Sequence, residues 1–123
     1  MGLELIPNDN FNPNRKPYHA LSDMSPDERN KLVKQNSKYG RIICHCEGIS
    51  EGEIVDAIRM NPGARDLDGV KRRTRAGMGR CQGGFCSPSV LEILARELGI
   101  RPEEVTKSGK GSYVLTGKTK EER

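Results

Sequence analysis

The sequence predicts a small, mostly α-helical domain with two cysteine-bearing loops, an extended N-terminal arm before it and a flexible C-terminal tail after it. Three observations support this fold class. Serine-led helix starts recur along the chain, the apolar residues after them follow a helical period, and all four cysteines fall into two close pairs. Since 33% of the 123 residues are apolar and tryptophan is absent, the chain can build one small core at most.

Residues 1–40 are expected to form an extended arm or linker with one short helix. The first part of the arm shows no period and is interrupted by Pro7, Pro13 and Pro17. Ser25 and Glu28 then form a capping box with proline at the first helical position, which predicts a helix that runs to about Gln35. Its apolar content, Leu32 and Val33, is thin, so this helix should pack weakly or against a partner.

Residues 41–107 are expected to form the domain itself. A β-branched run at 41–44 leads into the first cysteine pair, and a second capping box at Ser50 and Glu53 opens a helix that ends at 62–63. Asp68 is expected to cap a third helix, which should stop at Gly77.

The serine-proline start recurs at Ser87, and Gly99 ends the helix that follows. One further helical turn is predicted at 102–105. Beyond Lys107, glycine, serine and lysine dominate, so residues 108–123 are expected to be a flexible tail.

The two cysteine pairs predict a metal centre. A C-x-C pair in an extended segment presents both sulfurs on one face, and a glycine-containing C-x4-C loop can fold back to present two more. No run of apolar residues is long enough for a membrane span or a signal peptide, so we expect a cytoplasmic protein whose membrane association, if any, comes through partners. In a reducing compartment, paired cysteines favour metal binding over disulfides. The expected ligands are Cys44, Cys46, Cys81 and Cys86.

Two metal centres use four thiolates: a tetrahedral zinc ion and a [2Fe-2S] cluster. Zinc sites typically space their ligand pairs C-x2-4-C, and the first pair here, C-x-C, is tight for a single small ion. A centre with two irons is longer and tolerates unequal pairs. The spacing therefore favours iron, and a structural zinc module with four cysteine ligands and no redox role stays as the alternative.

The surroundings of the cysteines favour anionic sulfur. Each pair precedes a predicted helix start, where the partial positive charge stabilises a thiolate. The amides of Gly83 and Gly84 are available as donors to sulfur. Between the pairs, five cations occur within ten residues without an acidic neighbour: Lys71, Arg72, Arg73, Arg75 and Arg80. The first three can equally well be a solvated face, whereas Arg80, adjacent to Cys81, is the best candidate to interact with a negatively charged centre.

Three segments carry a resemblance to a known family. They read ICHCE at 43–47, SEGEIVDAI at 50–58 and LDGVKRRTRAGMGRCQGGFC at 67–86. Together they resemble the [2Fe-2S]-binding domain of the bacterioferritin-associated ferredoxin type, in the form found at the C-terminus of FAD-dependent anaerobic glycerol-3-phosphate dehydrogenases. The arm resembles the connector that follows the flavin domain in those enzymes. His45 stands where relatives often carry arginine, and the smaller ferredoxins close their second pair as C-x2-C.

The resemblance implies one [2Fe-2S] cluster on the four cysteines and an electron-transfer role in a C-terminal fragment of a FAD-dependent dehydrogenase. Electrons would pass from the flavin of a catalytic domain, which alone would hold FAD, to an acceptor protein or a quinone. An isolated fragment can instead take up zinc or stay empty.

Other classes of function have weaker support. The glycines near Met78 do not match a dinucleotide fingerprint, because no strand leads into them. No residue is placed to serve as a base for a cysteine nucleophile, so the fragment is expected to have no active site of its own. A nucleic-acid binder that uses the basic run ranks last, because no recognition helix is evident, and we expect no nucleic-acid partner.

Overall fold

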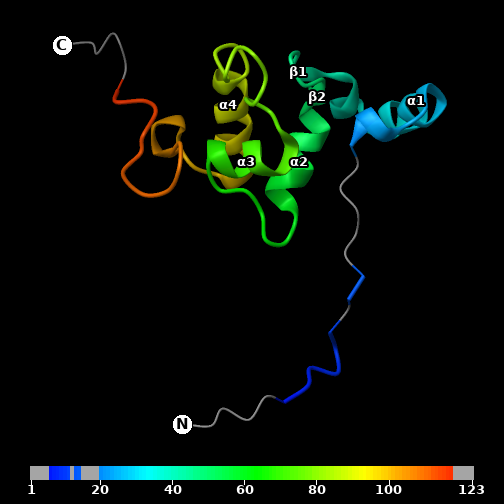
Figure 1. The fold of residues 1–123 in the computed structure, drawn as a ribbon. Coiled ribbons are helices and arrows are strands. Elements are labelled where there is room, and N and C mark those ends of the chain that lie inside the picture. The colour runs from blue at the N-terminus through cyan, green and yellow to red at the C-terminus, as the bar shows by residue number, and fades with distance from the viewer. Residues whose placement is uncertain (1–5, 12, 15–19, 118–123) are drawn as a thin grey trace.

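The computed structural model describes residues 6–11, 13, 14 and 20–117, and it is mostly helical. Three helices surround one core: α2 (Glu51–Arg59), α3 (Leu67–Thr74) and α4 (Ser87–Leu98). Figure 1 shows them grouped at the centre of the molecule, with α1 (Pro26–Gln35) at one side and the C-terminal segment at the other. Ile54, Val70, Leu94 and Val105 lie at the centre of this core and are completely buried.

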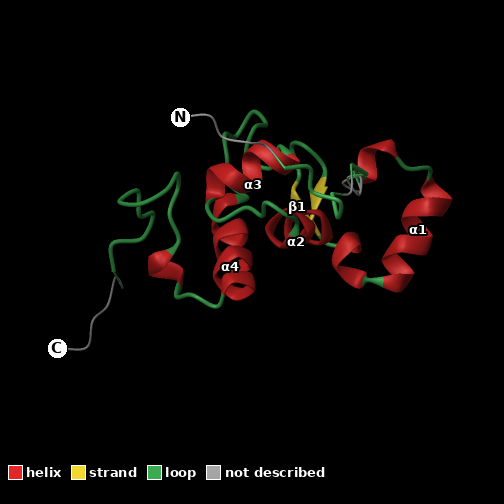
Figure 2. Ribbon diagram, turned by 90° about the horizontal axis from the view of Figure 1, so that it is seen from below, coloured by secondary structure: helices red, strands yellow, loops and turns green. Residues whose placement is uncertain are grey.

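A short hairpin carries the first cysteine pair. Strands β1 (Ile42–Cys44) and β2 (Ile49–Ser50) pair antiparallel, with an irregularity in register between Ile42 and Cys44. Figure 2 shows these strands beside α2, which follows β2 directly. The β-branched run at 41–44 forms β1 over its last three residues. Its partner strand was not predicted, because two residues are too few to show an alternating pattern.

Both predicted capping boxes are present. Ser25 accepts a hydrogen bond from the backbone N–H of Glu28, and the Glu28 side chain accepts one from the Ser25 N–H. The same reciprocal pair joins Ser50 and Glu53 at the start of α2. As predicted from its thin apolar content, α1 has no buried residue.

Both predicted ends of α3 are wrong. Its cap is Asp66, whose side chain accepts a 2.6 Å hydrogen bond from Gly69 N–H, whereas Asp68 lies in the first turn. The helix ends at Thr74, ahead of the expected stop, because Arg75 adopts a left-handed conformation with φ 69°. α4 begins one residue earlier than the serine-proline pattern predicts, since Cys86 takes the N-cap position and Ser87 is the first helical residue.

The arm is attached to the domain through the buried capping box. Leu21 is buried, and its backbone N–H donates a 3.0 Å hydrogen bond to Glu53 Oε1. Glu53 Oε2 accepts from the N–H and the hydroxyl of Ser50 at 2.7 and 2.8 Å. One carboxylate therefore caps α2 and holds the end of the arm. The expectations for residues 1–5, 12 and 15–19 lie outside the described residues.

Tyr39 packs the turn before the hairpin against α2. Tyr39 is buried in the 3₁₀ turn Ser37–Gly40, and its hydroxyl donates to Asp56. Burial, and then Asp56, raise the pKa of the phenol. The ring covers Gly52 so closely that a Cβ there would lie 2.6 Å from a ring carbon. Only glycine leaves room for the ring at this position of α2.

The segment after α4 folds back onto α3. Val105 is buried in the core, Leu67 N–H donates to the carbonyl of Thr106, and Asp68 N–H donates to that of Lys107. Thr106 pairs with Tyr113 in an isolated bridge that closes a turn. The start of the expected tail therefore has a defined conformation, whereas residues 118–123 lie outside the described residues. Among the described helices, none has both the length and the apolar character needed to cross a membrane.

The two capping boxes give a matched test of this architecture. Glu53→Ala should lower the free energy of unfolding by on the order of 3 kcal/mol, because it leaves the N–H groups of Leu21 and Ser50 buried without an acceptor. Glu28→Ala removes the same motif from an exposed helix and should cost much less. Urea denaturation of both variants measures the difference. Equal losses would contradict the role given to Glu53.

Candidate metal centre

Four elements of the fold carry the four cysteines. Cys44 ends β1, Cys46 lies in the hairpin loop, Cys81 lies in the loop between α3 and α4, and Cys86 occupies the N-cap position of α4. All four are free thiols. The two loops that were predicted to converge therefore lie at one end of the three-helix core.

The thiols meet across the two loops. Cys46 is close enough to Cys81 to lower the pKa of its thiol, and Cys44 is close enough to Cys86 to raise the pKa of that thiol. Each neighbouring pair thus takes one cysteine from each loop. Within the described part of the chain, no group of three or more His, Cys, Asp or Glu side chains is placed to hold a single metal ion.

Close backbone packing allows the loops to approach each other. Gly79 is buried against Cys46, and a Cβ at position 79 would overlap the Cys46 Cβ. Gly83 has φ +83°, and a Cβ there would lie 2.6 Å from the Ser87 hydroxyl. Neither contact leaves space for a larger residue. Nothing in the local sequence distinguishes Gly79, because its close approach is to a residue far earlier in the chain.

Two polar side chains whose role the local sequence does not reveal, those of Thr74 and Gln82, hydrogen-bond within the second loop. The Gln82 amide donates to the carbonyls of Met78 and Gly79 at 3.2 and 3.0 Å, and Gln82 itself has φ 50°. The buried Thr74 hydroxyl donates to the Val70 carbonyl and accepts from Ala76 N–H. These bonds hold the loop in a turn that places Cys81 opposite Cys46.

The two thiols of the second loop have opposite electrostatic environments. The backbone amide of Phe85, then the Cys46 side chain, and then the amides of Gly83 and Gly84 lower the pKa of Cys81. Burial, and then the neighbouring Cys44, raise the pKa of Cys86 to about 11. Desolvation of the buried Cys86 thus acts against the thiolate that the helix start was expected to favour.

Most cations of the basic run have partners in the domain. Three of them form ion pairs: Lys71 with Asp68 at 3.0 Å, Arg72 with Asp66 at 3.9 Å and Arg75 with Glu47 at 2.8 Å. Arg73 donates to the carbonyls of Pro62 and Gly69. The Arg75–Glu47 pair joins the two cysteine loops. Arg80 is exposed, and the described residues provide no partner for its guanidinium.

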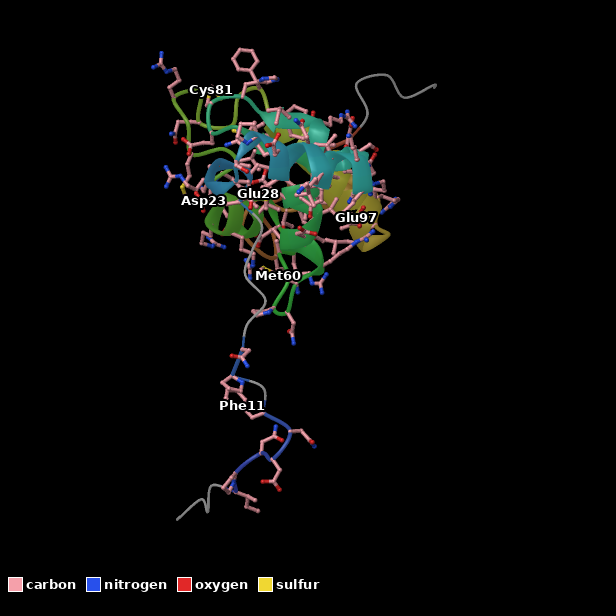
Figure 3. The ribbon with its side chains drawn as sticks, turned by 90° about the vertical axis from the view of Figure 1, so that its right-hand side faces the viewer. Phe11, Asp23, Glu28, Met60, Cys81 and Glu97 are labelled. Atoms are coloured by element: carbon pink, nitrogen blue, oxygen red, sulfur yellow. The ribbon has the colours of Figure 1, made fainter. Side chains whose placement is uncertain are left out.

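The two thiol pairs differ in depth. Cys44 and Cys86 are 1% and 2% exposed, whereas Cys46 is exposed and Cys81 is half-buried. Figure 3 shows Cys81 at the end of the molecule opposite the N-terminal arm. A centre held by both pairs would have one side in the core and one side near solvent.

Comparison with known families gives a match over the region just described. The model of the BFD-like [2Fe-2S] binding domain matches residues 42–96, which include all four cysteines. No solved structure shows significant similarity to the chain.

The curated relatives that match this chain are much longer proteins. A glycerol 3-phosphate dehydrogenase of Caloramator mitchellensis is 60% identical over 93% of the chain. Subunit A1 of the anaerobic glycerol-3-phosphate dehydrogenase of Haloferax volcanii is 39% identical over 68% of the chain. Hydrogen cyanide synthase subunit HcnB of Pseudomonas aeruginosa is 43% identical over 47%. The chain covers 24%, 14% and 12% of these proteins, in that order.

Substitution of Gly79 tests whether loop packing brings the thiols together. Gly79→Ala should lower iron retention after anaerobic reconstitution about tenfold or more, because the added methyl group overlaps Cys46. Gly84→Ala is the control in the same loop, since its methyl group would meet only the Cys81 carbonyl, at 3.1 Å. Iron analysis of the two variants measures the difference in iron retention. Full iron content in Gly79→Ala would show that the loops can separate without losing the metal.

Proposed function

We propose that the chain, whose residues 42–96 match the BFD-like [2Fe-2S] binding domain, binds one [2Fe-2S] cluster and transfers electrons. The proposed ligands are Cys44, Cys46, Cys81 and Cys86. The close packing of the two cysteine loops, with Gly79 against Cys46 and four free thiols between them, carries this proposal.

The donor set fits this cofactor. A [2Fe-2S] cluster takes two thiolates on each iron, so two neighbouring thiol pairs suit it better than they suit one tetrahedral ion. The lowered pKa of Cys81 supports a thiolate at the outer position, and metal binding displaces the protons of the buried thiols. The residues present therefore suit a two-iron centre that is partly enclosed by protein.

Other groups of the chain would tune the centre. The backbone amide of Phe85, and then those of Gly83 and Gly84, lower the pKa of Cys81, and amide donors of this kind favour added negative charge. Arg80 would contribute a positive charge from its position next to Cys81. The bound cluster supplies one-electron chemistry, and the protein supplies the charge environment that sets its potential.

We further propose that the chain is the electron-transfer part of a FAD-dependent dehydrogenase of the glycerol-3-phosphate type. Two of the relatives described above bear that name, and each is several times longer than the region it shares with this chain. The flavin would lie in the catalytic part of such a protein. The partners would be that FAD-binding part and an electron acceptor, either a protein or a quinone.

Anaerobic metal analysis tests the proposal directly. The purified chain should contain about two iron and two sulfide per molecule, with visible absorption that dithionite bleaches. Substitution of any one of the four cysteines by serine should remove most of this absorption. The control His45→Ala should keep it, because His45 lies exposed between two ligands and is not needed as one. A colourless protein that retains zinc would instead support a structural zinc module.

Arg80 provides a second prediction. Arg80→Gln should lower the reduction potential by on the order of tens of millivolts, since the loss of a nearby positive charge disfavours the added electron. Arg72→Gln removes the same charge from α3, where Asp66 already pairs with it, and should shift the potential much less. Redox titration followed by visible absorption measures both variants. Equal shifts would rule out a special role for Arg80.

A further inference from the structure

The cysteine loop carries an aromatic side chain that the domain does not use. Phe85 is 85% exposed, although it lies directly before the buried Cys86. The proposed cofactor site uses only the backbone of Phe85, whose amide lowers the pKa of Cys81. Any residue other than proline could supply that amide. The phenyl ring is therefore available for a contact outside the domain.

Other exposed side chains belong to the same loop. Met78 is 37% exposed, and the Gln82 amide ties its carbonyl to the turn that carries Cys81. We call the exposed part of the loop, together with the neighbouring outer thiol, the outer-thiol face; it consists of Cys46, Met78, Arg80, Cys81 and Phe85. It combines two apolar side chains, one cation and the two sulfurs nearest to solvent.

The charge of this face indicates the kind of partner that would fit it. No acidic residue occurs between Gly69 and Leu91, and Arg80 has no ion-pair partner among the described residues. A [2Fe-2S] cluster adds a formal charge of about −2 to the net charge of +4, so the loaded chain stays cationic. A carboxylate on a partner could pair with Arg80 without displacing any contact within the domain.

We propose that the outer-thiol face is the docking surface for an acidic redox protein, with Phe85 inserted as the central apolar anchor and Arg80 paired to a carboxylate at its rim. This inference rests on the proposed function, because it requires the cluster. Transient electron-transfer contacts are small, and one aromatic residue at the centre can carry much of the binding energy. The surface places the partner over Cys46 and Cys81, the shallow side of the centre, whereas Cys44 and Cys86 lie on the side away from it.

Electron exchange with two small redox proteins tests the proposal. The dithionite-reduced, cluster-loaded chain is mixed by stopped flow with oxidised flavodoxin, which is acidic, or with ferric cytochrome c, which is basic. Phe85→Ala should lower the second-order rate constant with flavodoxin about tenfold. Rising ionic strength should slow the reaction with flavodoxin and speed the reaction with cytochrome c.

Phe11→Ala is the matched control, since Phe11 is also an exposed aromatic residue, at 72%. Figure 3 shows it on the arm, far from Cys81. The midpoint potential of each variant is measured, so that rates are compared at equal driving force. Equal rates for the Phe85 and Phe11 variants, or a flavodoxin reaction that speeds up with salt, would overturn the docking proposal. A chain without visible cluster absorption would overturn the proposed function itself, before any kinetic measurement.

Discussion

The close contact between the two cysteine loops is the constraint on which the rest of this structure depends. Gly79 lies against Cys46 where no side chain could fit, and this contact brings Cys81 to Cys46 and Cys86 to Cys44. The Arg75–Glu47 ion pair joins the same two loops near the surface. Because each thiol pair contains one residue from each loop, a centre bound there would also cross-link the hairpin to the three-helix core. Metal binding and domain stability should therefore be coupled.

The inner and outer thiols of this site differ in burial. The inner thiols are surrounded by core residues, and burial raises the pKa of Cys86, while backbone amides lower that of the outer Cys81. A cofactor in this setting has a protected side and an accessible side. The exposed Arg80 guanidinium and the exposed phenyl ring of Phe85 both belong to the loop that holds the accessible side. The buried side of the centre would contribute to stability, and the accessible side would exchange electrons with partners.

The arm is attached at the start of α2, beside the hairpin. Glu53 uses one carboxylate oxygen to cap α2 and the other to bind the backbone of Leu21, so the arm is held by a residue that the helix needs in any case. This contact lies on the segment that follows the first cysteine loop. In the proposed setting, where a catalytic part is joined through the arm, such a contact would limit how far the cluster domain can turn relative to its neighbour.

The sequence by itself determined the local features: both capping boxes, the mostly helical class and the pairing of cysteines into two motifs, because these depend on residues only a few positions apart. The start of α3 was predicted wrongly, since Asp66 and Asp68 are both able to cap a helix and only the packed chain selects one of them. The tertiary structure alone decided which thiols are neighbours, which are buried and which cations are already paired. These properties depend on contacts between segments far apart in the chain, such as Gly79 with Cys46 and Arg75 with Glu47, and on the burial of Cys86.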